Sequence, residues 1–221
     1  LFSFPEEDLI IIERDWETIM GKVRSGRAHE LSEGDTLYLA ACTKGANART
    51  ARKQPFSSIP AKQRAYSLKA SYMTQILNKY IFGNVESEHV IKNWERLRYI
   101  SFEGYLIKSL IPFYGKSMNE LRSMFNVCST AKNENELILA KMLNVKGKIT
   151  QTEEFKKAGI VPKTVRVQRN GRIKESMSFP TFDFITLSQE TCWEDSELYN
   201  YLAPTKFLFV LFQEDQYGDY Y

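Results

Sequence analysis

Apolar side chains change their spacing along this chain, and that change restricts the folds open to it. Over residues 8–24 they recur every three or four positions, which predicts an amphipathic helix. Residues 36–42 favour a strand that delivers the chain to Lys44. Thr205–Gln213 is a nearly continuous apolar run, which is typical of a strand buried on both faces. The chain is therefore expected to fold as an α/β protein with mixed α and β elements.

The segment after the first predicted strand carries turn signals. Residues 46–63 are polar and basic and contain two prolines, so they are expected to form a loop. Residues 64–69 favour a short strand, with Ser67 and Lys69 on the same face. Ser71 is a suitable N-cap for the helix that follows.

The second half of the chain combines predicted helices with a predicted hairpin. Residues 84–100 are a mixed polar connector and the best candidate for a boundary between two domains. Residues 163–168 alternate, Asn170-Gly171 supplies a hairpin turn, and residues 172–179 are expected to return as the partner strand. Helices are predicted over three ranges: 103–110, 117–125 and 133–143.

Charge is distributed unevenly along the chain. Formal net charge is only +3, yet the stretch from Leu37 to Val85 has no Asp or Glu. The same stretch holds eight basic residues: Lys44, Arg49, Arg52, Lys53, Lys62, Arg64, Lys69 and Lys79. Residues 181–221 reverse this balance, with Lys206 against eight acids. A basic stretch of this kind indicates a polyanionic partner. The alternative is a solvated basic loop that pairs with the acidic tail.

Several classes of function lack support in the sequence. No apolar run approaches the length that spans a bilayer, and no signal peptide is recognisable. The chain has three cysteines without CxxC spacing, which indicates reduced thiols in a cytoplasmic protein. Only two histidines are present, so neither a zinc cluster nor a catalytic triad is supported. Nucleotide-binding glycine motifs are absent as well.

Lys44 stands at the end of a predicted strand and opens a turn of small residues. Gly45 lets the backbone approach a partner closely, and Asn47 follows two residues later. A lysine can donate to guanine O6 and N7, and an asparagine can pair with adenine in the major groove. These residue types suit base recognition, although a lysine at the end of a surface strand is common.

Two segments resemble the MutH-like type II restriction endonucleases that cut at GATC, and the related mismatch-repair endonuclease MutH. One runs through Leu31-Ser-Glu-Gly and Tyr38-Leu to Cys42-Thr-Lys-Gly-Ala-Asn-Ala. The other is Ala61-Lys-Gln-Arg-Ala-Tyr-Ser-Leu-Lys-Ala-Ser-Tyr-Met-Thr. The resemblance implies a restriction-endonuclease-like mixed sheet flanked by helices, and double-stranded DNA as the partner.

The resemblance also implies a DNA-reading surface. In the family the lysine equivalent to Lys44 reads GATC, and the strand equivalent to Tyr66–Lys69 lies against DNA. Ser67 stands where MutH has a methylation-sensing tyrosine, which implies binding regardless of methylation. The candidate DNA-binding residues are Lys44, Gly45, Asn47, Arg49, Arg52, Lys53, Arg64, Ser67 and Lys69.

Catalysis in this family uses an Asp…Glu-x-Lys arrangement that holds Mg²⁺. Nothing before His29 contains it, and the first residue is Leu rather than Met, so a catalytic lobe is expected to be missing. Residues from about 100 onward resemble a second, degenerate MutH-like domain. Glu154 and Lys163 mark its degenerate site, with Val161 in place of the catalytic Glu and Ala140 in place of a helical Glu. The parent enzyme is expected to use Mg²⁺, and this chain is expected to bind none.

The sequence therefore predicts three parts: residues 1–84 as the recognition half, 85–100 as the connector, and 101–221 as the start of the second domain. The leading hypothesis is the DNA-binding portion of a type II endonuclease specific for GATC, inactive by itself, in which two MutH-like domains pair as in a dimer. A non-catalytic DNA-binding effector is one alternative. A protein-interaction domain with a basic docking face is another.

Overall fold

The computed structural model describes residues 2–44, 50–83, 87–128 and 133–221. Its α-helices are α1 (Glu6–Arg24), α2 (Ala70–Tyr80), α3 (Phe102–Leu110), α4 (Met118–Phe125), α5 (Glu134–Met142), α6 (Glu153–Ala158), α7 (Phe184–Gln189) and α8 (Glu197–Leu202). The strands are β1 (Leu39–Thr43), β2 (Ala51–Gln54), β3 (Ser57–Lys62), β4 (Arg64–Leu68), β5 (Ile160–Val167) and β6 (Lys206–Gln213). Short 3₁₀ helices lie between them, as at Trp94–Arg98. The mixture of α and β elements agrees with the prediction.

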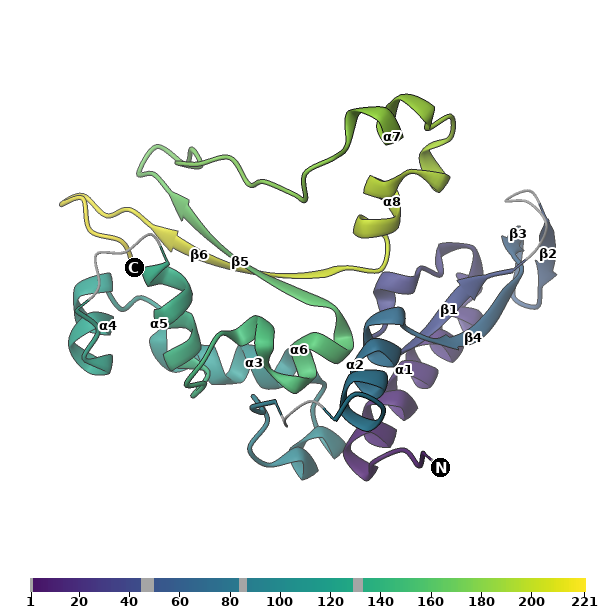
Figure 1. Cartoon of the computed structure of the whole chain (residues 1–221), viewed down its shortest axis with the longest axis horizontal. Coiled ribbons are helices and arrows are strands. Elements are labelled where there is room, and N and C mark those ends of the chain that lie inside the picture. The colour runs from purple at the N-terminus through teal and green to yellow at the C-terminus, as the bar shows by residue number, and fades with distance from the viewer. Residues whose placement is uncertain (1, 45–49, 84–86, 129–132) are drawn as a thin grey trace.

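The strands form three two-stranded sheets in the part of the chain that the structure describes, instead of the single mixed sheet expected. β1 and β4 are antiparallel, and Thr43 pairs with Arg64 at the end of this ladder. β2 and β3 are antiparallel, whereas β5 and β6 are parallel. Figure 1 shows β1 to β4 at one end of the molecule, beside α1 and α2, with β5 and β6 crossing above α3 and α6.

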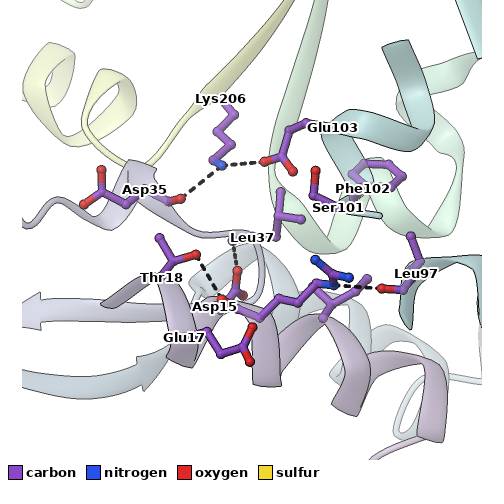
Figure 2. Close-up of a pocket in the computed structure, with 12 residues that line it drawn as sticks. Asp15, Glu17, Thr18, Asp35, Leu37, Leu97, Ser101, Phe102, Glu103 and Lys206 are labelled. Carbon is purple, nitrogen blue, oxygen red and sulfur yellow. Dashed lines mark hydrogen bonds and ion pairs between the residues drawn. The ribbon is translucent and has the colours of Figure 1, made fainter. Parts of the chain in front are cut away.

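A buried carboxylate connects helix α1 to strand β1. Asp15 Oδ1 accepts from the backbone N–H of Leu37 at 2.8 Å, and Oδ2 accepts from Tyr38 at 2.6 Å and from Leu39 at 2.8 Å. Figure 2 shows Asp15 directed at Leu37. Burial raises the pKa of the Asp15 carboxyl, and the three N–H groups counteract that rise. The helix and the start of the strand are thereby held in one arrangement.

Residues 51–62 form the β2–β3 hairpin, so the loop predicted over 46–63 is wrong there. Gln54 holds the hairpin in place: its side chain is buried, accepts from Ala28 N at 3.0 Å and donates to Ile59 O at 2.6 Å. Pro60 is exposed in β3, at a sheet edge, where a strand tolerates the missing N–H. Pairing with β2 and contact with residue 28 therefore outweigh the local turn signals.

Helix α2 confirms the predicted helix but begins two residues earlier than expected. Lys69 is its N-cap residue, and no side chain caps it. The Ser71 hydroxyl instead donates to the carbonyl of Lys157 at 2.8 Å, which joins α2 to α6. Ser71 was predicted to be the cap, and the close approach of α6 explains the difference.

The parallel partner of β5 comes from far along the chain. The predicted hairpin over residues 163–179 is wrong, because Val167 and Ile173 form only an isolated bridge and β5 pairs with β6. β6 directs Leu208 and Val210 onto the main core, whereas Phe209 is 49% exposed. The prediction that this strand is buried on both faces is therefore wrong as well. Figure 1 shows the chain between β5 and β6 running through α7 and α8, two short helices that the sequence did not predict.

One hydrophobic core crosses the predicted connector. It includes Ile10 and Tyr72 from the first part of the chain and Phe102 and Phe155 from the second. Within residues 85–100, Val90, Ile91 and Leu97 are buried in the same cluster. The division of the chain into two domains stays a prediction, and the connector residues contribute to the shared core.

The three helices expected in the middle of the chain are present. Ser117 and Glu120 form the capping box of α4, as their spacing predicts. Asn133 and Glu136 have the same spacing at the start of α5 and likewise predict a capping box, but Asn133 makes no side-chain cap, so that prediction is wrong. None of the described helices is long and apolar enough to cross a lipid bilayer.

We predict that Asp15→Ala lowers the free energy of unfolding by roughly 3 kcal/mol or more, because three buried N–H groups lose their acceptor. Glu13→Ala, at an exposed position of the same helix, should change it by about 0.5 kcal/mol or less. Urea denaturation followed by circular dichroism measures both. A loss below about 1 kcal/mol in Asp15→Ala would show that other groups satisfy these donors.

Candidate nucleic-acid interface

The end of the β1–β4 ladder presents Lys44. β1 ends at Thr43, and the backbone N–H of Lys44 donates to Gln63 O at 2.8 Å, which extends the pairing by one residue. The Lys44 side chain is exposed to solvent. A flexible ammonium group therefore projects from a backbone that is hydrogen-bonded up to its own residue.

Gln63 organises the backbone around this point. Its N–H donates to Thr50 O at 3.4 Å, so Lys44 and Thr50 are both bonded to one residue between β3 and β4. Its side-chain oxygen accepts from Arg52 Nε at 3.1 Å and from Arg52 Nη2 at 2.9 Å. The Arg52 guanidinium is thus held at the surface beside the end of the ladder.

Four cations share this region: Lys44, Arg52, Lys53 and Lys62. We call them the basic surface. All four are exposed, and none forms a salt bridge within the described ranges. Exposed cations that form no salt bridge can exchange bound counterions for phosphate groups. Lys62 was counted among the basic residues of the acid-free stretch but was not selected as a site residue, and its position on β3 places it here.

Three predicted site residues lie outside the described residues: Gly45, Asn47 and Arg49. Their assignment stays a prediction.

Ser67 is described, lies on β4 opposite Ala40 and is partly buried. Its neighbour Tyr66 is 59% exposed on the other face of the strand. Tyr66 is not among the predicted site residues, although the alternation of a strand identifies it as a surface residue.

Lys69 does not belong to the basic surface, contrary to the prediction. It is 5% exposed, and its ammonium donates to Thr36 O at 2.6 Å and to Pro204 O at 3.2 Å. Burial and the neighbouring charge of Lys206 lower the pKa of Lys69 to about 8. The strand alternation would have placed Lys69 beside Ser67, but β4 ends at Leu68 and the chain turns into α2.

Arg64 also points inward. Its Nη1 donates to Ala41 O at 2.9 Å and its Nη2 donates to Leu31 O. The expected surface cation therefore binds two backbone carbonyls. Of the six described candidates for DNA contact, the structure leaves Lys44, Arg52 and Lys53 exposed and Ser67 half-buried, and it turns Arg64 and Lys69 into the protein.

The predicted degenerate catalytic residues are held in different places. Glu154 is buried and accepts from His89 Nδ1 at 3.1 Å, from Val90 N at 3.0 Å and from Ile91 N at 3.2 Å. Lys163 lies on strand β5, and its ammonium donates to the carbonyl of Ser178 at 3.2 Å. Glu154 thus fastens residues 89–91 to α6, and Lys163 contacts the segment that follows β5.

These residues do not fit a Mg²⁺ ion. Val161 offers no ligand, and the Glu154 oxygens are already occupied by backbone and imidazole N–H groups. Over the ranges that the structure covers, no group of three His, Cys, Asp or Glu side chains is arranged to hold a metal. We therefore derive no metal-dependent step from this chain.

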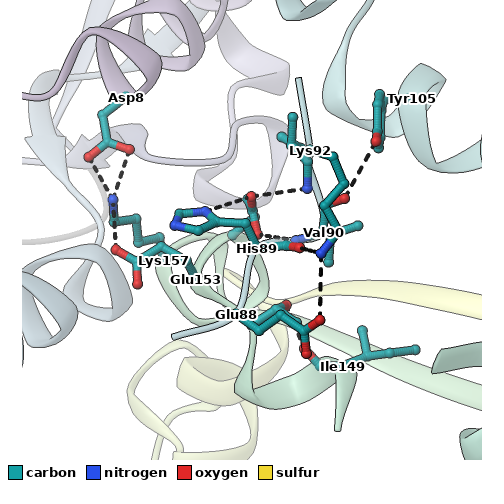
Figure 3. Close-up of polar contacts among 12 residues, drawn as sticks. Asp8, Glu88, His89, Val90, Lys92, Tyr105, Ile149, Glu153 and Lys157 are labelled. Atoms are coloured by element: carbon teal, nitrogen blue, oxygen red, sulfur yellow. Dashed lines mark hydrogen bonds and ion pairs between the residues drawn. The ribbon is translucent and has the colours of Figure 1, made fainter. Parts of the chain in front are cut away.

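A second ionic cluster lies beside Glu154. Lys157 Nζ donates to both Asp8 oxygens at 2.9 and 2.8 Å and lies 3.1 Å from Glu153 Oε1. Figure 3 shows Lys157 between these two carboxylates, with His89 close by. The Tyr72 hydroxyl donates to Asp8 at 2.8 Å. All these charges are paired within the protein, so the cluster joins α1, α2 and α6 and leaves no free group for chemistry.

A cavity of about 270 Å³ lies between α1 and the 3₁₀ helix that ends at Asp35. Lys206 borders it and donates to Asp35 O at 3.2 Å and to Glu103 Oε1 at 2.8 Å, as Figure 2 shows. Lys206, the first residue of β6, is thereby bonded to both halves of the chain. Because the Lys206 ammonium is already bonded to Asp35 and Glu103, this cavity lies at a structural contact between the two halves of the chain.

A known protein matches nearly the whole chain. Over 223 residues the chain is 44% identical to the type II restriction enzyme Sau3AI of Staphylococcus aureus. The match covers 96% of this chain and 45% of the enzyme, so the chain spans less than half the length of this relative. No family model matches the chain.

The His89–Glu154 pair predicts a pH-dependent stability. The hydrogen bond to Glu154 raises the pKa of His89 above its usual 6.5, so its contribution is complete below that value and is lost as pH rises through the folded-state pKa. The same contact lowers the pKa of Glu154 below 4.5, and its contribution is lost on acidification. We expect the free energy of unfolding to fall as pH rises from about 6 to about 8.

The test compares urea denaturation at several pH values in His89→Asn and in the wild-type chain. Asparagine keeps an N–H donor but has no charge to lose, so the free energy of unfolding should fall less between about pH 6 and about pH 8. If the free energy of unfolding falls equally in His89→Asn and in the wild-type chain, the pH dependence belongs to other groups.

Proposed function

We propose that this chain is the DNA-binding portion of a type II restriction endonuclease that recognises GATC in double-stranded DNA. The observation that carries the proposal is the basic surface, whose four exposed cations have no carboxylate partner in the described part of the chain. The similarity to a type II restriction enzyme over 96% of the chain supports the same proposal. We further propose a MutH-like fold with two related domains that pair as in a dimer.

Binding would combine two kinds of contact. Arg52, Lys53 and Lys62 would neutralise phosphates, which supplies affinity without reading sequence. Lys44 would donate to guanine O6 and N7 in the major groove, because its backbone is fixed and its ammonium is free. Asn47 and Arg49 would add contacts from the adjoining segment. Ser67 supports recognition regardless of adenine methylation.

Hydrolysis of the phosphodiester would take place elsewhere. The described residues offer no set of ligands for Mg²⁺, and the matched part is 45% of the related enzyme. We propose that the parent enzyme uses Mg²⁺ in a separate catalytic lobe and acts in the cytoplasm. This chain by itself would bind DNA and leave it uncut.

The salt dependence of binding tests the electrostatic part. If three to five cations meet phosphates, log K should fall with log[salt] with a slope of roughly −3 to −5. Fluorescence anisotropy on labelled duplexes between low and moderate salt measures this slope. Absence of DNA affinity together with binding to an acidic protein would favour the protein-docking alternative.

Lys44→Ala tests base recognition. We expect it to weaken binding to a GATC duplex by about 1–3 kcal/mol and to weaken binding to a scrambled duplex much less, because a base contact is lost. Lys108→Ala, at an exposed position of α3, is the matched control and should leave both affinities unchanged. Equal losses of affinity on both duplexes would make Lys44 a phosphate contact.

A cleavage assay with Mg²⁺ on the same duplexes tests whether the chain by itself leaves DNA uncut.

A further inference from the structure

Arg64 lies where the candidate recognition strand ends, yet its guanidinium is directed into the protein. It is the first residue of β4 and pairs with Thr43, the last residue of β1. Its Nη1 donates to Ala41 O at 2.9 Å, and its Nη2 donates to Leu31 O. Its Nε is buried and has no hydrogen-bond partner among the described residues. The side chain therefore joins two backbone segments through carbonyl groups.

The two carbonyls belong to parts of the chain that determine where Lys44 stands. Ala41 is buried in the middle of β1, three residues before Lys44. Leu31 is buried in the turn after the 3₁₀ helix Ala28–Glu30. Because a guanidinium is a rigid planar fork, two donors from one group fix the distance and angle between their acceptors. Arg64 thus holds the last part of β1 against this turn.

Arg52 provides the contrast within the same region. Its guanidinium is exposed and bonds to the Gln63 side chain at the surface, where it is open to an anion. Arg64 is partly buried, and two of its nitrogens donate to carbonyls on the inner side of the strand. The two arginines carry the same charge, but only Arg52 is directed at solvent.

We propose that Arg64 is a positioning residue for DNA recognition. It would fix the strand end that carries Lys44 and would make no phosphate contact of its own. This inference rests on the proposed function, since it concerns the accuracy with which Lys44 meets a base. Its consequence is specific: Arg64 supports discrimination between sequences, whereas Arg52 supports the salt-dependent affinity shared by all sequences.

The experiment compares Arg64→Met, Arg64→Lys and Arg52→Met with the wild-type chain. Anisotropy titrations on GATC and scrambled duplexes give the affinity ratio, and a salt series on the scrambled duplex gives the slope. We expect Arg64→Met to reduce the ratio at least tenfold and to leave the slope unchanged. Arg52→Met should make the slope shallower by about 0.9 and leave the ratio unchanged.

Other outcomes overturn the inference. A shallower slope with an unchanged ratio in Arg64→Met would make Arg64 a phosphate contact. If Arg64→Met does not fold, as judged by circular dichroism, Arg64→Lys decides, because it keeps the charge and loses the fork. A reduced ratio in Arg64→Lys supports positioning, and a wild-type ratio overturns it. A wild-type chain that does not distinguish GATC from scrambled DNA contradicts the proposed function itself.

Discussion

The arrangement of the first half of this protein depends on one carboxylate, that of Asp15. It accepts three consecutive backbone N–H groups, from Leu37 to Leu39, at 2.6 to 2.8 Å. These N–H groups lie at the entry to β1 and are directed at α1. An unsatisfied buried donor is costly, so the carboxylate fixes both the direction of the strand and its distance from the helix. The position of Lys44, five residues further on, follows from that arrangement.

The charged residues of this chain serve two different purposes. On the basic surface, Lys44 and Arg52 are exposed and form no salt bridge with any residue that the structure describes. In the interior, Lys157 lies between Asp8 and Glu153, and its charge is fully paired. An interior charge needs such partners because desolvation is expensive, whereas a surface charge is solvated until a ligand replaces the water. The buried acidic residues Asp8 and Glu153 therefore stabilise the fold, whereas the exposed cations of the basic surface are solvated.

The second part of the chain is held together by buried structural contacts. Glu154 uses its oxygens to hold residues 89–91, and Ala140 and Ala158 are buried in the core. The same core includes Leu97 from the predicted connector. Because α6 contacts α2 through Ser71, this part also supports the helix that follows β4. A structural role for the second part therefore accompanies the absence of a fitting metal site in the described residues.

The sequence by itself determined the features that depend on neighbouring residues. The helical spacing of residues 8–24, the Ser117–Glu120 capping box and the apolar run of β6 all appear where local patterns place them. The count of charges likewise identified the acid-free stretch that carries Lys44, Arg52, Lys53 and Lys62, because such a count needs no coordinates.

Only the tertiary structure decided which distant groups meet. β5 pairs with β6, whose Leu208 and Val210 cover the core. No local signal in residues 163–179 reveals that β6 competes with the predicted hairpin partner for β5. The directions of Arg64 and Lys69 depend on carbonyls at Leu31 and Pro204, which packing brings within reach. A sequence states that a side chain is cationic, but whether it faces solvent or a buried carbonyl depends on long-range packing that the local pattern does not contain.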